Sequence, residues 1–335
     1  MYTQVVDEEN LTDMKWVQTK IDLDQYIIIV EVDETQMESS DKFVEDYIYN
    51  LSKTSVERSK TLWDLHIINV KTRQAESVVV FRVHHSLGDG TSLISLLLAC
   101  TRQTADDLKL PTIPTKKRRP TPSDYSAKEG LWILLGKFWL LMVILVNTAV
   151  DVFMFIITIM FLKDTKTPIS APPDFESNKA RRIVHRIISL DDLKFVKNAM
   201  NVDLANMMEN GSKGKRGWGN WFGYALLPFK IALRDNPLDY VKEAKATVDR
   251  FTNLVGPQEE IGFCGYPITN FAPSAYGQPS ALMINFQCYI NKMIIVASVD
   301  ENAIPDPHQL LDDFEDSLNL IKNAVIEKGL VKNLK

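Results

Sequence analysis

The stretch that decides the fold is 77–90, which reads SVVVFRVHHSLGDG. Its first part is a nearly continuous β-branched run, a pattern typical of a buried central strand. Two histidines, His84 and His85, follow at once, and two glycines flank Asp89. The next residues, TSLISLLLAC, are strongly apolar and open with residue types that favour a helix start. The pattern therefore predicts a strand, a tight turn and a helix.

The flanking sequence alternates strand and helix patterns, which indicates a mixed α/β fold. We expect strands within 15–33 and over 63–70, 77–83, 181–189, 282–289 and 292–299, and helices over 41–52, 91–100, 189–200, 237–250 and 307–327. The last two strands read as a hairpin that turns at Ile290-Asn291. No repeat or low-complexity tract interrupts this order.

Composition narrows the class of protein. The chain has 335 residues, of which 45% are hydrophobic and 24% charged, and its net charge is −5. These values exclude a wholly disordered, collagen-like or multi-span membrane protein, and they give no electrostatic reason to expect a nucleic-acid partner. The three cysteines, Cys100, Cys264 and Cys288, are far apart and odd in number. A disulfide framework or a structural zinc site is not expected, and a reducing compartment fits best.

The middle of the chain differs from both flanks. Residues 105–129 contain several prolines and the basic cluster 116–119, and we interpret them as a linker. Residues 130–162 are the most hydrophobic stretch and exceed the roughly 20 residues needed to cross a bilayer. Their polar interruptions fall within one narrow arc of a helical wheel: Lys137, Asn147, Thr148, Asp151 and Thr158. We expect membrane association here, with a buried core helix as the alternative.

The histidine motif is the one pattern with specific chemistry. Consecutive strand side chains point to opposite faces, so one of His84 and His85 is expected to act and the other to pack. Glycines at the turn would let the backbone bend without a Cβ penalty. Asp89 is expected to fix the turn or to pair with a cation such as Arg82. A neutral imidazole suits general-base work, and no further His or Cys lies nearby to build a metal site.

HHSLGDG resembles the H-H-x-x-x-D-G motif of the coenzyme-A-dependent acyltransferases. KTLWDLHIINV is similar to a region of the wax ester synthase/diacylglycerol acyltransferase family, with Thr61 where the family has proline. The segments GNWFGYALLPFKIALRDNPLDYVKEAK, TNLVGP and VDENAIPDPHQLLDDFEDSL resemble the C-terminal domain of the plant members. The D-F-G-W-G motif of the phenolic acyltransferases is absent, which disfavours a soluble enzyme for small phenolic alcohols.

The resemblance implies an α/β, two-lobed fold like that of chloramphenicol acetyltransferase and the peptide-synthetase condensation domains. The implied parts are an N-terminal lobe over 1–104, the linker 105–129, the membrane-associated segment 130–162 and a C-terminal lobe over 173–335. The implied reaction moves a long-chain fatty acyl group from acyl-CoA to a long-chain alcohol or to diacylglycerol. No other cofactor and no metal are implied.

The resemblance also assigns residues. His85 is implied as the base that takes the hydroxyl proton, and Asp89 as the residue that holds the geometry of the loop. His84 and Gly90 support the motif. The N-x-x-G-P stretch near the family's site supplies three further supporting residues, Asn253, Gly256 and Pro257.

The junction at 201–203 departs from the family's pattern. The sequence runs directly through 201–203, where family members have several dozen more residues, so a core segment is expected to be missing there. The alternative function is therefore an inactive, shortened isoform that binds lipid or a protein partner.

The localisation that the resemblance implies is the endoplasmic reticulum membrane, with the plasma membrane as the alternative. The two lobes are expected in the cytosol.

The hydrophobic segment also raises a question of topology. A single full span would put His85 and the C-terminal half on opposite sides of the bilayer, whereas the family's site lies between the two halves. We therefore expect 130–162 to lie in the interface, or to dip in and return with a bend at Asn147–Asp151.

Overall fold

The structure, a computed structural model, describes residues 4–7, 15–18, 20–33, 38–56, 60–112, 131–161, 180–200, 233–248, 257, 259–278 and 280–330. The chain forms two compact units. The larger unit combines described residues from both sides of the hydrophobic segment, and the smaller unit contains that segment. Predictions for the linker beyond Thr112 and for the junction at 201–203 lie outside the described residues.

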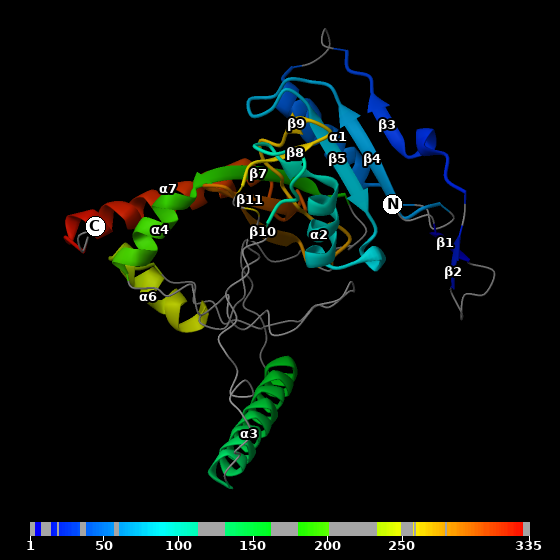
Figure 1. The fold of residues 1–335 in the computed structure, drawn as a ribbon. Coiled ribbons are helices and arrows are strands. Elements are labelled where there is room, and N and C mark those ends of the chain that lie inside the picture. Colours follow the sequence, from blue (N-terminus) through cyan, green and yellow to red (C-terminus); the bar gives the residue numbers. More distant parts are fainter. Residues whose placement is uncertain are drawn as a thin grey trace. The chain divides into compact units, whose positions relative to one another are not determined.

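The first half of the chain forms a three-stranded sheet in the order β3 (Ile27–Val30), β4 (Trp63–Ile68), β5 (Val78–Val83). Strands β3 and β4 are parallel, and β4 and β5 are antiparallel. A parallel pair needs a crossover connection, and helix α1 (Ser40–Ser52) lies in it. The Ser39 hydroxyl caps α1 by accepting from the backbone N–H of Lys42. These elements, blue to cyan in Figure 1, confirm the predicted strands and helix.

Three short elements precede this sheet: β1 (Gln4–Asp7), β2 (Lys15–Gln18) and the 3₁₀ helix η1 (Leu23–Gln25). Strands β1 and β2 pair antiparallel as a ribbon. Strand β1 was not predicted, because the stretch before the first alternating pattern is short and acidic.

The interpretation of β5 as a buried central strand is wrong for the described sheet. Strand β4 takes the central position, between β3 and β5. Val79 of β5 is 51% exposed, whereas Trp63 and Ile68 of β4 are 2% and 0% exposed. The β-branched composition of β5 therefore reflects strand propensity rather than burial on both faces.

The second half of the chain forms an antiparallel sheet in the order β10 (Leu282–Tyr289), β11 (Lys292–Val299), β7 (Arg182–Ser189). The predicted hairpin is confirmed, with its turn at Ile290-Asn291. The helices of this half are α4 (Leu190–Ala199), α6 (Pro237–Val248) and α7 (Pro307–Glu327). Ser189 caps α4 and Asp306 caps α7, so both predicted helix starts are confirmed.

Both faces of this second sheet are covered, and its strands alternate accordingly. Val184 and Ile188 of β7 point to one face, where they pack with Leu311 of α7. Ile294 and Val296 of β11 point to the other face, where they pack with Leu98. Leu98 belongs to α2 (Gly90–Cys100), the helix that follows the histidine motif. A helix from the first half of the chain thus completes the core of the second half.

Further contacts join the halves. Strand β6 (Arg102–Gln103) precedes the hydrophobic segment, yet it pairs with β8 (Ile261–Phe263), which in turn pairs with β9 (Tyr266–Pro267). The Ser52 hydroxyl accepts from the backbone N–H of Arg181 at 2.8 Å and lies 3.1 Å from that residue's carbonyl oxygen. Both side chains are buried. These contacts make the two halves one body.

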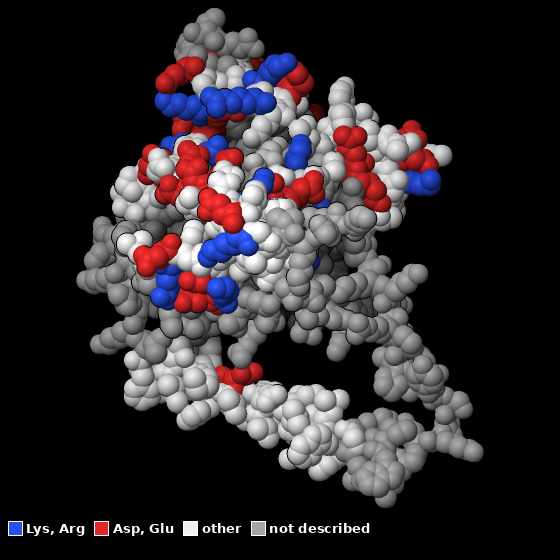
Figure 2. Space-filling view, turned by 90° about the vertical axis from the view of Figure 1, so that its left-hand side faces the viewer, with Lys and Arg blue, Asp and Glu red and all other residues white. Residues whose placement is uncertain are grey.

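The hydrophobic segment forms α3 (Leu131–Phe161), an uninterrupted helix of 31 residues. At 1.5 Å per residue it is about 46 Å long. Among the described residues, 138–161 is the one stretch that is long and apolar enough to cross a membrane, and none of it is buried. In Figure 2 helix α3 is white apart from an acidic side chain, whereas Lys, Arg, Asp and Glu side chains are frequent on the described surface of the larger unit.

The predicted bend at Asn147–Asp151 is wrong. Helix α3 passes through these residues without a break. Sharp kinks in helices arise almost always at proline, at Gly/Ser pairs or at bulges, and the only residue of this kind in 131–161 is Gly136, in the second turn. A segment that dips into the bilayer and returns therefore does not fit this part of the chain.

We predict that truncation of Leu311 destabilises the protein strongly. This side chain is fully buried between α7 and the second sheet, so Leu311→Ala is expected to lower the free energy of unfolding by about 2–5 kcal/mol. Leu320→Ala on the same helix is the matched control, because Leu320 is 60% exposed. The control is expected to change stability by less than about 0.5 kcal/mol. Equal shifts of the two urea-unfolding midpoints would contradict this account of the core.

Candidate active site

The histidine motif lies where β5 ends. The backbone N–H of His84 still donates to the Leu62 carbonyl at 2.8 Å, so this residue keeps the partner of the regular sheet. A single turn of 3₁₀ helix, η3 (His85–Leu87), follows. The Leu87 side chain is 5% exposed and packs in a cluster with Tyr26, Leu62 and Trp63. The turn is thus anchored to the core of the first sheet.

His84 serves as the N-cap of this turn. Its Nδ1 accepts from the backbone N–H of Ser86 at 3.2 Å and lies 2.8 Å from the Ser86 hydroxyl. An accepting Nδ1 leaves the proton of the neutral ring on Nε2. The side chain is half-buried. His84 therefore holds the turn together.

His85 is the first residue of the 3₁₀ turn, and its side chain is exposed. The strand has ended before it, so the strict alternation that separates neighbouring side chains no longer applies. The two histidines still take different surroundings: one caps the turn and the other presents its ring at the surface.

Asp89 is buried and caps α2. One oxygen, Oδ1, accepts from the backbone N–H of Ser92 at 2.8 Å and from the Thr91 hydroxyl at 2.7 Å. The carboxylate also suits the partial positive charge of a helix N-terminus. The side chain therefore fixes the start of the helix that follows the motif.

The expected partner of Asp89, Arg82, lies elsewhere. Its Nε donates to Asp64 Oδ1 at 3.0 Å, and its Nη1 donates to the Leu51 and Thr54 carbonyls, each at 3.2 Å. Arg82 is paired across the β4–β5 ladder with Asp64, so its direction is set by the strand. The proposed Arg82–Asp89 ion pair is therefore a wrong expectation.

The expectation for the two glycines also needs correction. Gly88 has an extended backbone, with φ 165° and ψ 162°, which any residue adopts. Gly90 is the first residue of α2, and a Cβ built on it would meet no atom within 4 Å. The tight turn is made by the 3₁₀ helix rather than by left-handed glycine. What glycine provides at position 90 is open space beside the backbone.

A polar network joins β4 to α1 and, through Asp64, to Arg82 of β5. The sequence analysis did not predict it. His66 is 4% exposed; its Nε2 lies 3.1 Å from Asp64 Oδ1, and its Nδ1 lies 2.8 Å from the Tyr47 hydroxyl. Burial raises the pKa of Tyr47, so its hydroxyl stays protonated. The missed signal is the spacing in WDLHIINV, which puts Asp64 and His66 on one face of β4.

The N-x-x-G-P stretch is described only at its end. Asn253 and Gly256 lie outside the described residues, whereas Pro257 is buried. The Pro257 carbonyl accepts from the backbone N–H of Ile290 at 3.2 Å, which ties it to the turn of the β10–β11 hairpin. Ile290 has φ 56°, an uncommon value for a β-branched residue, and this contact is one that holds it.

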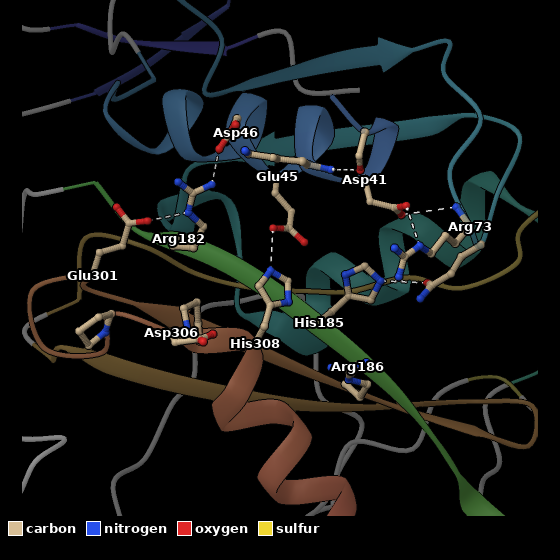
Figure 3. A pocket seen from close by; sticks show the side chains of 15 residues that line it. Asp41, Glu45, Asp46, Arg73, Arg182, His185, Arg186, Glu301, Asp306 and His308 are labelled. Carbon is tan, nitrogen blue, oxygen red and sulfur yellow. Dashed lines mark hydrogen bonds and ion pairs between the residues drawn. The ribbon is translucent and has the colours of Figure 1, made fainter. Parts of the chain in front are cut away.

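A separate polar pocket of about 570 Å³ is drawn in Figure 3. No residue of the histidine motif lines it. Several of its charged side chains pair with one another: Arg73 with Asp41, Arg182 with Asp46 and Glu301, and His308 with Glu45. Pockets for fatty chains are lined mainly by apolar side chains. This pocket therefore does not fit an acyl group, and the histidine motif remains the candidate active site.

The described residues contain no group of three or more His, Cys, Asp or Glu that could hold a metal ion. The site can supply an exposed imidazole, a helix N-terminus fixed by a buried carboxylate and unobstructed backbone at Gly90. These are the parts required to remove a proton from a hydroxyl group beside an already activated acyl donor.

Comparison with known proteins identifies the family. The family model "Wax ester synthase/diacylglycerol acyltransferase catalytic domain" matches residues 2–208, and "WS/DGAT C-terminal domain" matches 218–251 and 250–322. Wax ester synthase/diacylglycerol acyltransferase 11 of Arabidopsis thaliana is 37% identical over 424 residues, which cover 98% of this chain and 86% of the relative. Wax ester synthase/diacylglycerol acyltransferase 4 from the same plant is 36% identical over 430 residues, which cover 97% of this chain and 81% of that relative.

The fold agrees with a solved structure. The wax ester synthase/diacylglycerol acyltransferase from Marinobacter aquaeolei VT8 matches with a TM-score of 0.55 at 13% identity, over 96% of this chain and 85% of that chain. The two-lobed acyltransferase fold is thereby established. The first Arabidopsis alignment runs over 424 positions, whereas this chain has 335 residues, so the relative has at least 89 positions without a counterpart here. The chain belongs to the wax ester synthase/diacylglycerol acyltransferase family.

Proposed function

We propose that this protein transfers a long-chain fatty acyl group from acyl-CoA to the hydroxyl of a long-chain alcohol or of diacylglycerol. Family membership supports this reaction class. The observation that carries the proposal is the arrangement of the motif: an exposed His85 stands on a turn that is anchored by Leu87 and followed by a helix capped by Asp89. An inactive isoform, the alternative drawn from the sequence, gains no support from these matches.

In the proposed mechanism, the His85 imidazole acts as general base. It takes the proton from the acceptor hydroxyl while the oxygen attacks the thioester carbonyl carbon. The tetrahedral intermediate collapses, the carbon–sulfur bond breaks, and the coenzyme A thiolate takes the proton from the imidazolium. An ester and free coenzyme A are the products, and the imidazole is neutral again.

The other site residues position this base. Asp89 fixes the N-terminus of α2, His84 caps the 3₁₀ turn, and Gly90 leaves room for the acyl donor beside the backbone. We assign Asn253, Gly256 and Pro257 to the same site as supporting residues. A thioester is already activated, so a base and good positioning suffice. The reaction then needs acyl-CoA as co-substrate but no further cofactor and no metal.

We also assign the protein to a membrane surface, with the endoplasmic reticulum as the expected compartment. The exposed apolar surface of α3 and the solubility of both proposed acceptors in lipid support this assignment. Nothing in the proposed chemistry separates an alcohol acceptor from diacylglycerol, because both present a primary or secondary hydroxyl to the same base.

The first prediction concerns the base. His85→Ala is expected to lower kcat for acyl transfer by about 10²–10⁴-fold, the usual contribution of general-base catalysis. The assay follows labelled palmitoyl-CoA in membranes that express the chain. His308→Ala is the control, since His308 lies outside the motif and is 52% exposed. An unchanged rate for His85→Ala would rule out this residue as the base.

The second prediction separates positioning from stability. Asp89→Ala removes a helix cap and is expected to cost about 0.5–2 kcal/mol of stability, and to lower kcat by about 10–100-fold through misplacement of the motif. Asp306→Ala is matched, because Asp306 caps α7 in the same way, with its Oδ1 3.0 Å from the Gln309 nitrogen. It should cost similar stability but leave kcat of the folded fraction unchanged. Equal activity losses would contradict a positioning role for Asp89.

The third prediction concerns the acceptor. Membranes that express the 335-residue chain are supplied with palmitoyl-CoA and either hexadecanol or diacylglycerol. Wax ester or triacylglycerol is expected above the level of an empty-vector control, and its formation should be lost in His85→Ala. Absence of both products from protein that sediments with membranes and resists protease would refute the proposed activity.

A further inference from the structure

The two halves that flank α3 in the sequence form one body. Strand β6 lies before α3 and β8 after it, and they pair in one small sheet. Leu98 of α2 packs against Ile294 and Val296 of β11. The buried Ser52 hydroxyl accepts a hydrogen bond from the backbone N–H of Arg181, with 2.8 Å between the oxygen and the nitrogen. Since these contacts bury apolar and polar groups together, the two halves must lie on the same side of any membrane.

This requirement conflicts with a simple span. A helix that crosses the bilayer once would leave its two flanks on opposite faces. One of the connectors, 113–130 or 162–179, would then have to cross back. Each connector has at least six charged residues and three prolines. Charged side chains are costly in the lipid core, so neither connector has a sequence suited to a second crossing.

The distribution of polar side chains on α3 fits a different orientation. Asn147, Asp151 and Thr158 share one narrow arc of the helix, within about 100° of the wheel. Met142, Phe153 and Met160 lie on the opposite side, with 41%, 61% and 70% of their surface exposed. A helix in the plane of the membrane can turn such a stripe toward headgroups and its apolar side toward acyl chains.

The flanking charge agrees with this orientation. Lys116, Lys117, Arg118 and Arg119 precede α3, and Lys163 and Lys166 follow it. Basic residues remain on the cytosolic side of membranes and are attracted to anionic lipid. Lysines therefore stand on both sides of α3, and their positions are compatible with both ends at the same surface.

We propose that α3 is embedded in a single leaflet, parallel to the membrane plane, with its Asn147–Asp151–Thr158 stripe toward the headgroups and both halves of the protein on the same face. This inference rests on the membrane association in the proposed function. By length and hydropathy alone, residues 138–161 would be a candidate membrane-spanning helix. The proposed orientation differs from that assignment. One consequence is that acyl donor and lipid acceptor reach the enzyme from the same side of the membrane.

The depth of single positions along α3 tests the proposal. In a variant with Cys100, Cys264 and Cys288 replaced by alanine, single cysteines are placed on the stripe or opposite it. The stripe positions are Asn147, Asp151 and Thr158, and the opposite positions are Met142, Phe153 and Met160. A fluorophore is attached to each cysteine, and the protein is bound to phosphatidylcholine–phosphatidylserine vesicles. One vesicle preparation contains lipids with a nitroxide near the headgroup, and a second contains lipids with a nitroxide deep in the acyl chain. The ratio of the two quenching efficiencies reports depth.

Neighbouring positions separate the two orientations. A helix in the membrane plane makes Asp151→Cys shallow and Phe153→Cys deep, and depth repeats every 3.6 residues. A spanning helix places these two positions at nearly equal depth near the bilayer centre, and makes Met142→Cys and Met160→Cys shallow. A smooth profile with its deepest point near the middle of the helix would overturn the proposal.

Sidedness provides the second measurement. Lys71→Cys before α3 and Leu320→Cys after it lie on exposed side chains, 74% and 60% accessible. In sealed microsomes, a membrane-impermeant maleimide is expected to label both to the same extent with and without detergent. Labelling of one position only after detergent would overturn the proposal.

Failure of the proposed function gives a different result from failure of this inference. If the protein does not float with vesicles or sediment with microsomes, membrane association is wrong and the orientation falls with it. If it binds membranes but shows a spanning profile, only the orientation is wrong. The acyl-transfer assay with His85→Ala is independent of both outcomes, because it compares two variants with identical α3.

Discussion

The burial of both faces of the β10–β11–β7 sheet is the constraint on which the rest of the structure depends. One face is covered by α7 and α4, which follow or flank the sheet in the second half of the chain. The other face is completed by α2, together with residues of the β8–β9 region. Because α2 belongs to the first half, neither half can bury its apolar surface without the other.

The same constraint links the core to the site. Helix α2 packs through Leu98 at one end, while Asp89 caps its other end directly after the histidine turn. The Leu87 side chain fixes that turn to the first sheet. His85 is thus held between two anchored elements, and its ring projects from a short segment whose backbone has little freedom. Positioning of this kind supports the proposed role of His85 as general base.

Much of the fold follows from local pattern. The two-residue alternation around Ile290-Asn291 predicted the hairpin, and Ser189 marked the start of α4. The errors have a common cause. The β-branched run of β5 does not reveal how many neighbours the strand has. Arg82 pairs with its cross-strand partner Asp64 rather than with Asp89, although Asp89 is nearer in the sequence. Short strands such as β6 and β8 have too few residues for a periodic signal.

The sequence by itself determined three features: the HHSLGDG motif at the end of a strand, an apolar helix over 131–161 with a polar stripe, and the α/β order of elements. Tertiary structure alone decided which histidine is turned outward, which residue Asp89 contacts, and that chain segments on both sides of α3 form one body. The physical reason is that periodicity reports which face of an element is apolar, whereas partner choice depends on packing between residues far apart in the chain.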